Sequence, residues 1–253
     1  IDIGSTCAKT VVLNEKKEII QEFVQPTGWS SVDTAEEIHQ KLELAGINLS
    51  DDSSCCVATG YGRISVPYAD KTVTEITCHA LGAVHLFQQP NLTVVDIGGQ
   101  DTKIIQIEQG FVKDFIMNDK CAAGTGRFLE VMANTLSLRP NEMFDLARLG
   151  SDTTISSMCT VFAESEVIGL IGKGEPKENI AYAVVNSTIR KVAAQVSRMN
   201  GELSTFCLTG GLCECDYIRE ALSKELGKEV ISYPDARYAG AIGAALSAMK
   251  IRR

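Results

Sequence analysis

Residues 1–12 read IDIGSTCAKTVV and residues 95–106 read VDIGGQDTKIIQ, and these two stretches decide the fold. Each is an apolar segment that runs into Asp-Ile-Gly, a short polar turn and a lysine seven positions after the aspartate, before a second apolar segment. Apolar segments on either side of a glycine-containing turn predict a strand–turn–strand hairpin. A hairpin that occurs twice in one chain predicts two related lobes.

The rest of the chain alternates predicted strands and helices, which is typical of an α/β protein. Helices are predicted over 33–45, 124–136, 141–149, 160–172, 177–199, 214–226 and 238–250. The repeat places the lobe boundary near residue 89. We therefore expect one lobe over 1–89 and a second over 90–253, with the last helix, at about 238–250, packing back on the first lobe.

The two turns have a composition that suits phosphate binding. Glycines let the backbone approach an anion, so that N–H groups can point at phosphate oxygens, and short polar side chains add hydrogen bonds. Lys9 adds a positive charge beside the first turn. The other candidate phosphate-binding residues are Gly4, Ser5, Thr6, Gly98, Gly99 and Gln100.

Two carboxylates and a third glycine motif extend this interpretation. Asp2 and Asp96 end the strands that lead into the turns, where a carboxylate can hold Mg²⁺ through water. Gly210 and Gly211 follow another apolar segment and would leave room for a nucleoside against the backbone. Either hairpin alone reads as an ordinary turn. Two hairpins with the same Asp-to-Lys spacing, together with the third motif, predict nucleotide binding.

The segments Asp2–Lys9, Asp96–Lys103 and Leu208–Leu212 resemble the phosphate-1, phosphate-2 and adenosine motifs of actin, sugar kinases and chaperone ATPases. The resemblance implies an α/β fold of two duplicated ribonuclease-H-like lobes, of the actin-like ATPase kind, with ATP or ADP and Mg²⁺ in the cleft between them. In such a catalytic site Gln100 or Asp101 would position the attacking water, and the sequence leaves both residues open.

Two of the nine cysteines lie in a distinctive setting. Cys121 and Cys159 are each at or just before the start of a predicted helix, where the helix dipole favours a thiolate or an anionic cluster. A cubane cluster usually takes four thiolates, which two cysteines from each of two chains would supply. On these residues alone, buried free thiols and a shared cluster both stay open. The other seven cysteines read as core or turn residues.

Six stretches of the chain resemble the activators of 2-hydroxyacyl-CoA dehydratases, a family that includes ATPase subunits of benzoyl-CoA reductases. These stretches are NDKCAAGTGRFLE, SMCTVFAESE, DIGST, TGYGR, DIGGQD and AGAIGAAL. The likeness extends over essentially the whole chain. It implies a homodimer with one 4Fe–4S cluster between its subunits, held by Cys121 and Cys159. It also implies an ATP-driven one-electron donor that a ferredoxin or flavodoxin reduces and that activates a dehydratase or reductase component.

Composition excludes several other classes of function. The net charge is −8, and the largest basic cluster is the four-residue C-terminal stretch, so we expect no nucleic-acid partner. No apolar run reaches the roughly 18–20 residues of a membrane span, so we expect no membrane partner and a cytoplasmic protein.

Two alternative functions stay open. A small-molecule kinase acting on a sugar or a carboxylate could use the same nucleotide site, with Asp101 as the base for a substrate hydroxyl. An actin-like protein that assembles with ATP would carry the same motifs.

Overall fold

The computed structural model describes residues 1–51, 53–156, 159–201 and 205–251. Met158, which belongs to the second cysteine segment, and the C-terminal Arg252 and Arg253 lie outside the described residues. The chain divides into two compact units. The first contains residues 1–92, 107–113 and 235–253, and the second contains residues 93–106 and 114–234.

A three-stranded sheet with helices around it forms most of the first unit. The strands lie in the order β1-β2-β3, each antiparallel to its neighbour. A short parallel pair, β4-β5, follows. The elements are β1 (Asp2–Ile3), β2 (Cys7–Leu13), β3 (Ile19–Pro26), α1 (Ser31–Leu44), β4 (Val57–Ala58), β5 (Lys71–Thr72), α2 (Glu75–Phe87) and α8 (Ala239–Ile251), with 3-10 turns at Arg63–Ser65 and Pro234–Tyr238.

Helix α1 covers one face of this sheet because its apolar residues recur at helical spacing. The Ser30 side chain begins the helix by accepting a hydrogen bond of 3.1 Å from the Asp33 amide. Ile38 and Leu42 lie one turn apart and pack with Ile3 of β1 in a single apolar cluster.

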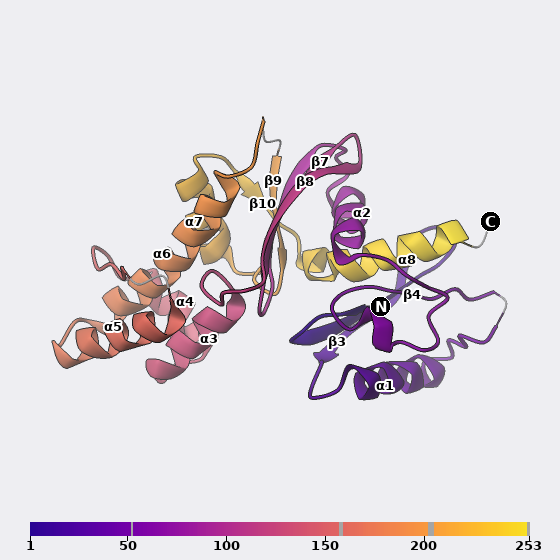
Figure 1. The fold of residues 1–253 in the computed structure, drawn as a ribbon, viewed down its shortest axis with the longest axis horizontal. Coiled ribbons are helices and arrows are strands. Elements are labelled where there is room, and N and C mark those ends of the chain that lie inside the picture. The colour runs from indigo at the N-terminus through magenta and orange to yellow at the C-terminus, as the bar shows by residue number, and fades with distance from the viewer. Residues whose placement is uncertain (52, 157–158, 202–204, 252–253) are drawn as a thin grey trace. The chain divides into compact units, whose positions relative to one another are not determined.

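Helices α2 and α8 lie side by side in the first unit, and glycines let them approach closely (Figure 1). A methyl group at Gly82 would lie 1.8 Å from the Ala239 carbonyl oxygen, and one at Gly243 would lie 1.7 Å from the Cys78 carbonyl oxygen. Either position therefore excludes every residue with a side chain unless the helices separate. This close contact places the last helix of the chain in the first unit.

The second unit contains most of a five-stranded sheet with the strand order β10-β9-β6-β7-β8, while Leu92 of β6 and the parts of β7 and β8 within 107–113 are counted with the first unit. β6 is buried along its whole length and β7 over nearly all of it, as expected for central strands. The elements are β6 (Leu92–Ile97), β7 (Thr102–Glu108), β8 (Phe111–Asn118), α3 (Gly126–Thr135), α4 (Pro140–Ala147), α5 (Thr160–Gly172), α6 (Lys177–Val196), β9 (Thr205–Gly210), α7 (Asp216–Leu226) and β10 (Val230–Ile231).

The predicted helices form close to the predicted bounds. The helix predicted over 160–172 is α5 (Thr160–Gly172), and the other predicted helices shift by one to three residues at their ends. Among the described residues, no helix is long and apolar enough to span a bilayer.

Candidate functional site: two hairpin turns and two cysteine loops

The first turn is a hairpin with the predicted register. β1 and β2 pair so that Asp2 lies opposite Lys9, which explains the seven-residue spacing between them. The Gly4 amide donates 3.1 Å to the Cys7 carbonyl and closes the turn, and Ser5 and Thr6 are exposed at its tip.

The second turn closes in the same way. β6 and β7 are neighbours in the sheet, and the Gly98 amide donates 2.9 Å to the Asp101 carbonyl, the equivalent of the Gly4–Cys7 bond. Gln100 is exposed at the tip. The sequence repeat is therefore a repeat in hydrogen bonding as well.

The duplication extends to a Thr-Gly pair in each unit, Thr59-Gly60 and Thr209-Gly210, whose equivalence was not predicted. Gly60 and Gly210 have φ values of +83° and +85°, in the left-handed region that favours glycine. A methyl group at Gly60 would lie 2.4 Å from Asp2 Oδ1, and one at Gly210 would lie 2.9 Å from Asp96 Oδ1. The signal was present in the sequence as Ala-Thr-Gly at 58–60 and Leu-Thr-Gly at 208–210.

The two aspartates that were predicted to be equivalent differ in their surroundings. Asp96 is 3% exposed and is paired within the protein: Lys103 Nζ lies 3.3 Å from its Oδ2, and the Thr209 hydroxyl donates 2.7 Å to its Oδ1. Lys103, only 1% exposed, also lies 2.8 Å from Asp101 Oδ1. Lys103 was not among the predicted site residues, although its spacing from Asp96 is visible in the sequence.

Asp2 is equally buried, at 3% exposed, but its Oδ1 has no hydrogen-bond partner within the described part of the chain. Gly60 and Gly240 leave room for its carboxylate, since a methyl at either position would lie 2.4 Å from one of its oxygens. A buried carboxylate oxygen without a donor is costly unless a cation or a bound water satisfies it. No group of three or more potential ligand side chains occurs among the described residues. A single carboxylate such as that of Asp2 is compatible with Mg²⁺, which is usually bound through one or two carboxylates together with substrate phosphates and water.

The two candidate cysteines both lie in the second unit. Cys159 is exposed and is the N-cap residue of α5, as predicted. Cys121 is half-buried and is not at the start of a helix, because α3 begins only at Gly126, with Thr125 as its N-cap. The prediction that Cys121 lies at or just before a helix start was therefore wrong, since residues 121–125 form a loop and the helix begins five residues after the cysteine.

Each cysteine loop is held by a side chain from a neighbouring element. Asn118, at the end of β8, donates 2.8 Å to the Cys121 carbonyl. The Ser156 amide and hydroxyl both donate to the Glu166 carboxylate of α5, at 3.0–3.3 Å. These contacts hold the backbone at Cys121 and at Ser156, and they leave Cys159 exposed and Cys121 half-buried.

Five of the seven remaining cysteines are poorer candidates for metal ligands because they are buried or because burial disfavours their thiolate. Burial raises the pKa of the thiols of Cys56, Cys78, Cys207 and Cys215, which disfavours the thiolate. Cys213 is buried. Two thiolates per chain do not complete a four-thiolate site, so the donor set fits one half of a cluster.

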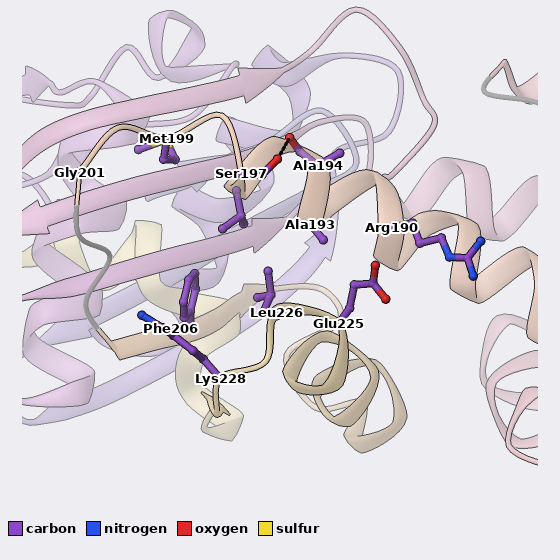
Figure 2. Close-up of a pocket in the computed structure, with 11 residues that line it drawn as sticks. Arg190, Ala193, Ala194, Ser197, Met199, Gly201, Phe206, Glu225, Leu226 and Lys228 are labelled. Carbon is purple, nitrogen blue, oxygen red and sulfur yellow. Dashed lines mark hydrogen bonds between the residues drawn. The ribbon is translucent and has the colours of Figure 1, made fainter.

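A cavity of about 690 Å³ lies elsewhere in the second unit (Figure 2). Phe206, at the start of β9, and Met199 line it, with Arg190 and Glu225 at one end. Gly210 is at the other end of β9, about 13 Å away at 3.3 Å per residue. The cavity is therefore separate from the candidate adenosine loop.

Comparison with known proteins agrees with this geometry. The sequence model of the BadF/BadG/BcrA/BcrD ATPase family matches residues 1–248. The (R)-2-hydroxyglutaryl-CoA dehydratase activating ATPase of Acidaminococcus fermentans is 44% identical, over 99% of this chain and 96% of that protein.

Solved structures show the same likeness. The activator of 2-hydroxyisocaproyl-CoA dehydratase from Clostridium difficile, solved with bound ADPNP, has a TM-score of 0.88 and 34% identity and covers 99% of this chain and 93% of its own. A ROK family glucokinase from Streptomyces griseus, at 16% identity and a TM-score of 0.59, shares the fold over 98% of both chains. These likenesses confirm the predicted fold class.

Proposed function

Because the chain belongs to the BadF/BadG/BcrA/BcrD ATPase family, we propose that it is an ATP-dependent one-electron donor that activates a 2-hydroxyacyl-CoA dehydratase or a related CoA-ester reductase. The observation that carries the proposal is the pair of cysteines, one exposed and one half-buried, in the same unit as the second phosphate-type turn. A ferredoxin or flavodoxin is the proposed electron donor, and the dehydratase or reductase component the acceptor.

Nucleotide binding is proposed for the turns of both units. The C. difficile activator was solved with bound ADPNP, which supports the binding of ATP and ADP by this chain. In each unit a turn closed by a glycine amide presents its remaining backbone and small polar side chains to phosphate. The proposed ATP-binding residues are Gly4, Ser5, Thr6, Lys9, Gly98, Gly99, Gln100, Gly210 and Gly211.

For Mg²⁺, Asp2 is the stronger candidate of the two aspartates. Asp96 is already neutralised by Lys103, whereas Asp2 keeps an oxygen without a hydrogen-bond donor among the described residues. Asp2→Asn should raise the Mg²⁺ concentration needed for half-maximal ATP hydrolysis by about tenfold or more. Asp33→Asn, at an exposed position of α1, is the matched control. An unchanged Mg²⁺ requirement in the Asp2 variant would show that the ion is held elsewhere.

Gln100 is the better placed of the two candidate catalytic residues. It is exposed at the tip of the second turn, whereas the Asp101 carboxylate binds Lys103 at 2.8 Å. We assign Gln100 to positioning the attacking water and Asp101 to holding the base of the turn. Gln100→Ala should lower the rate of ATP hydrolysis by roughly 100-fold with little change in nucleotide affinity, and a full rate would transfer the role to another residue.

Cys121 and Cys159 are proposed as the two ligands that each chain gives to a shared 4Fe–4S cluster. When bound, the cluster would supply one-electron chemistry. The chain itself holds the segments that carry the two thiols, through the bond from Asn118 to the Cys121 carbonyl and the bond from the Ser156 amide to Glu166. The exposed apolar residues of α5, the helix that Cys159 caps, support a second copy of the chain as the source of the other two thiolates: Val161, Phe162, Ile168 and Ile171.

Iron and acid-labile sulfide per chain, measured on protein purified without oxygen, test the proposal directly. About four of each per two chains are expected, with loss of both in Cys159→Ser and no loss in Cys207→Ser, which changes a buried thiol. Iron-free protein after anaerobic reconstitution would contradict the electron-transfer function. Phosphoryl transfer to a sugar or a carboxylate would then become the leading hypothesis.

A further inference from the structure

The second turn and the first turn of α3 are joined by backbone hydrogen bonds. The Gly126 amide donates 2.9 Å to the Gly98 carbonyl, and the Arg127 amide donates 2.7 Å to the Gly99 carbonyl. These are the first two amides of α3, which have no partner within the helix itself. The turn therefore serves as the cap of α3.

The Cys121 loop is fastened to the same hairpin. The Thr102 hydroxyl, on a residue that is 0% exposed, donates 2.6 Å to the Gly124 carbonyl. Thr125, also fully buried, donates from its amide at 3.0 Å and from its hydroxyl at 2.6 Å to the Ala122 carbonyl. Three hydrogen bonds thus hold residues 122–125, one of them from the hairpin and two within the loop itself.

The Gly98-Gly99 turn and the first turn of α3 are closely packed. A methyl group at Gly126 would lie 3.2 Å from the Gly98 carbonyl oxygen and 3.4 Å from the Gly99 Cα. Closely packed segments pass on a displacement instead of absorbing it. The carbonyl of a peptide group points away from its N–H, so one turn can bind phosphate on one side and α3 on the other.

We propose that the Gly98-Gly99 turn, the first turn of α3 and the loop 121–125 form one relay, with Thr102 as its positioning residue, that carries the state of the bound nucleotide to Cys121. The relay rests on the proposed function, since it takes the second turn to be a phosphate site. Cys159 is held differently, through Ser156 and Glu166 of its own helix. The nucleotide should therefore act on Cys121 more than on Cys159.

Thiol alkylation of the full-length, cluster-free chain tests the relay without electron transfer. The rate at which iodoacetamide modifies each cysteine is followed by peptide mass spectrometry, with MgADP or with a non-hydrolysable Mg–ATP analogue. In the wild type, the Cys121 rate should differ between the two nucleotides by about fivefold or more, and the Cys159 rate by clearly less. Calorimetric titration measures nucleotide affinity in the same samples.

Thr102→Val removes the hydroxyl but keeps the shape, and it should abolish most of the Cys121 response while nucleotide affinity stays unchanged. Thr93→Val is the matched control, because Thr93 is fully buried in the neighbouring strand β6 and its hydroxyl has no hydrogen-bond partner among the described residues. Thr102→Ser should restore the response. Gly126→Ala adds a methyl group 3.2 Å from the Gly98 carbonyl oxygen and so perturbs the contact between α3 and the turn. It provides a second test if the valine variant does not fold.

The two proposals fail in different ways. A wild type that binds both nucleotides but shows equal Cys121 rates would overturn the relay and leave the ATPase assignment standing. A full Cys121 response in both Thr102→Val and Gly126→Ala would overturn it as well. A chain that binds neither nucleotide would overturn the proposed function together with the relay.

Discussion

Replacing Lys103 with methionine removes a buried cation that two carboxylates share. Lys103 is 1% exposed, the Asp96 side chain 4% and the Asp101 side chain 25%, so Asp96 cannot regain water while Asp101 can do so in part. Removing one partner of a buried ion pair costs about 3–5 kcal/mol, and the partial exposure of Asp101 places the expected loss near 3–4 kcal/mol. For a chain of this size, that loss corresponds to a melting temperature lower by roughly 6–16 °C.

Urea unfolding followed by far-UV circular dichroism measures the loss. The double variant Lys103→Met with Asp96→Asn should recover most of it, because the buried negative charge is removed together with its partner. Lys113→Met is the control: Lys113 lies 2.8 Å from Glu108, but both side chains are about half exposed, so its loss should be about 0–1 kcal/mol. A Lys103→Met chain as stable as the Lys113→Met chain would refute the idea that Lys103 neutralises the core of the second hairpin.

Three further expectations concern packing, pH and thiol reactivity. Gly243→Ala should lower the free energy of unfolding by about 3 kcal/mol, because its methyl would lie 1.7 Å from a carbonyl oxygen of α2. Gly169→Ala, with no atom within 4 Å of the added methyl, should raise the free energy of unfolding by up to about 1 kcal/mol. A thermal melt of each variant measures both changes. A hydrogen bond from a threonine hydroxyl lowers the pKa of Glu175 below its ordinary 4.5, so its stabilisation is present above pH 4.5 and is lost as the pH falls through the lowered value. Unfolding curves of wild type and Glu175→Gln should therefore converge in acid. Cys159 is exposed, whereas Cys207 is buried and its pKa is raised by that burial, so iodoacetamide should modify Cys207 at least about 100-fold more slowly in native protein and at a similar rate in urea.

Local features of the chain were predictable from the sequence because they depend on neighbouring residues. The Asp-to-Lys spacing follows from the register that sets Asp2 opposite Lys9 across a short turn. Helix α5 begins and ends where its apolar pattern does, at Thr160 and Gly172. The two turns and the fold class were predictable for the same reason, since the motifs that indicate them lie within short, recognisable stretches.

Only the tertiary structure decided which of the repeated residues are equivalent in chemistry. Asp2 and Asp96 occupy matching positions in the repeat. Asp96 is paired with Lys103 and accepts a hydrogen bond from Thr209, whereas Asp2 keeps an oxygen without a donor among the described residues. The bond from Gly126 to the Gly98 turn also joins segments whose sequences give no sign of each other. Charge compensation and close packing depend on which residues meet in space, and a local pattern fixes the shape of each segment but not its partners.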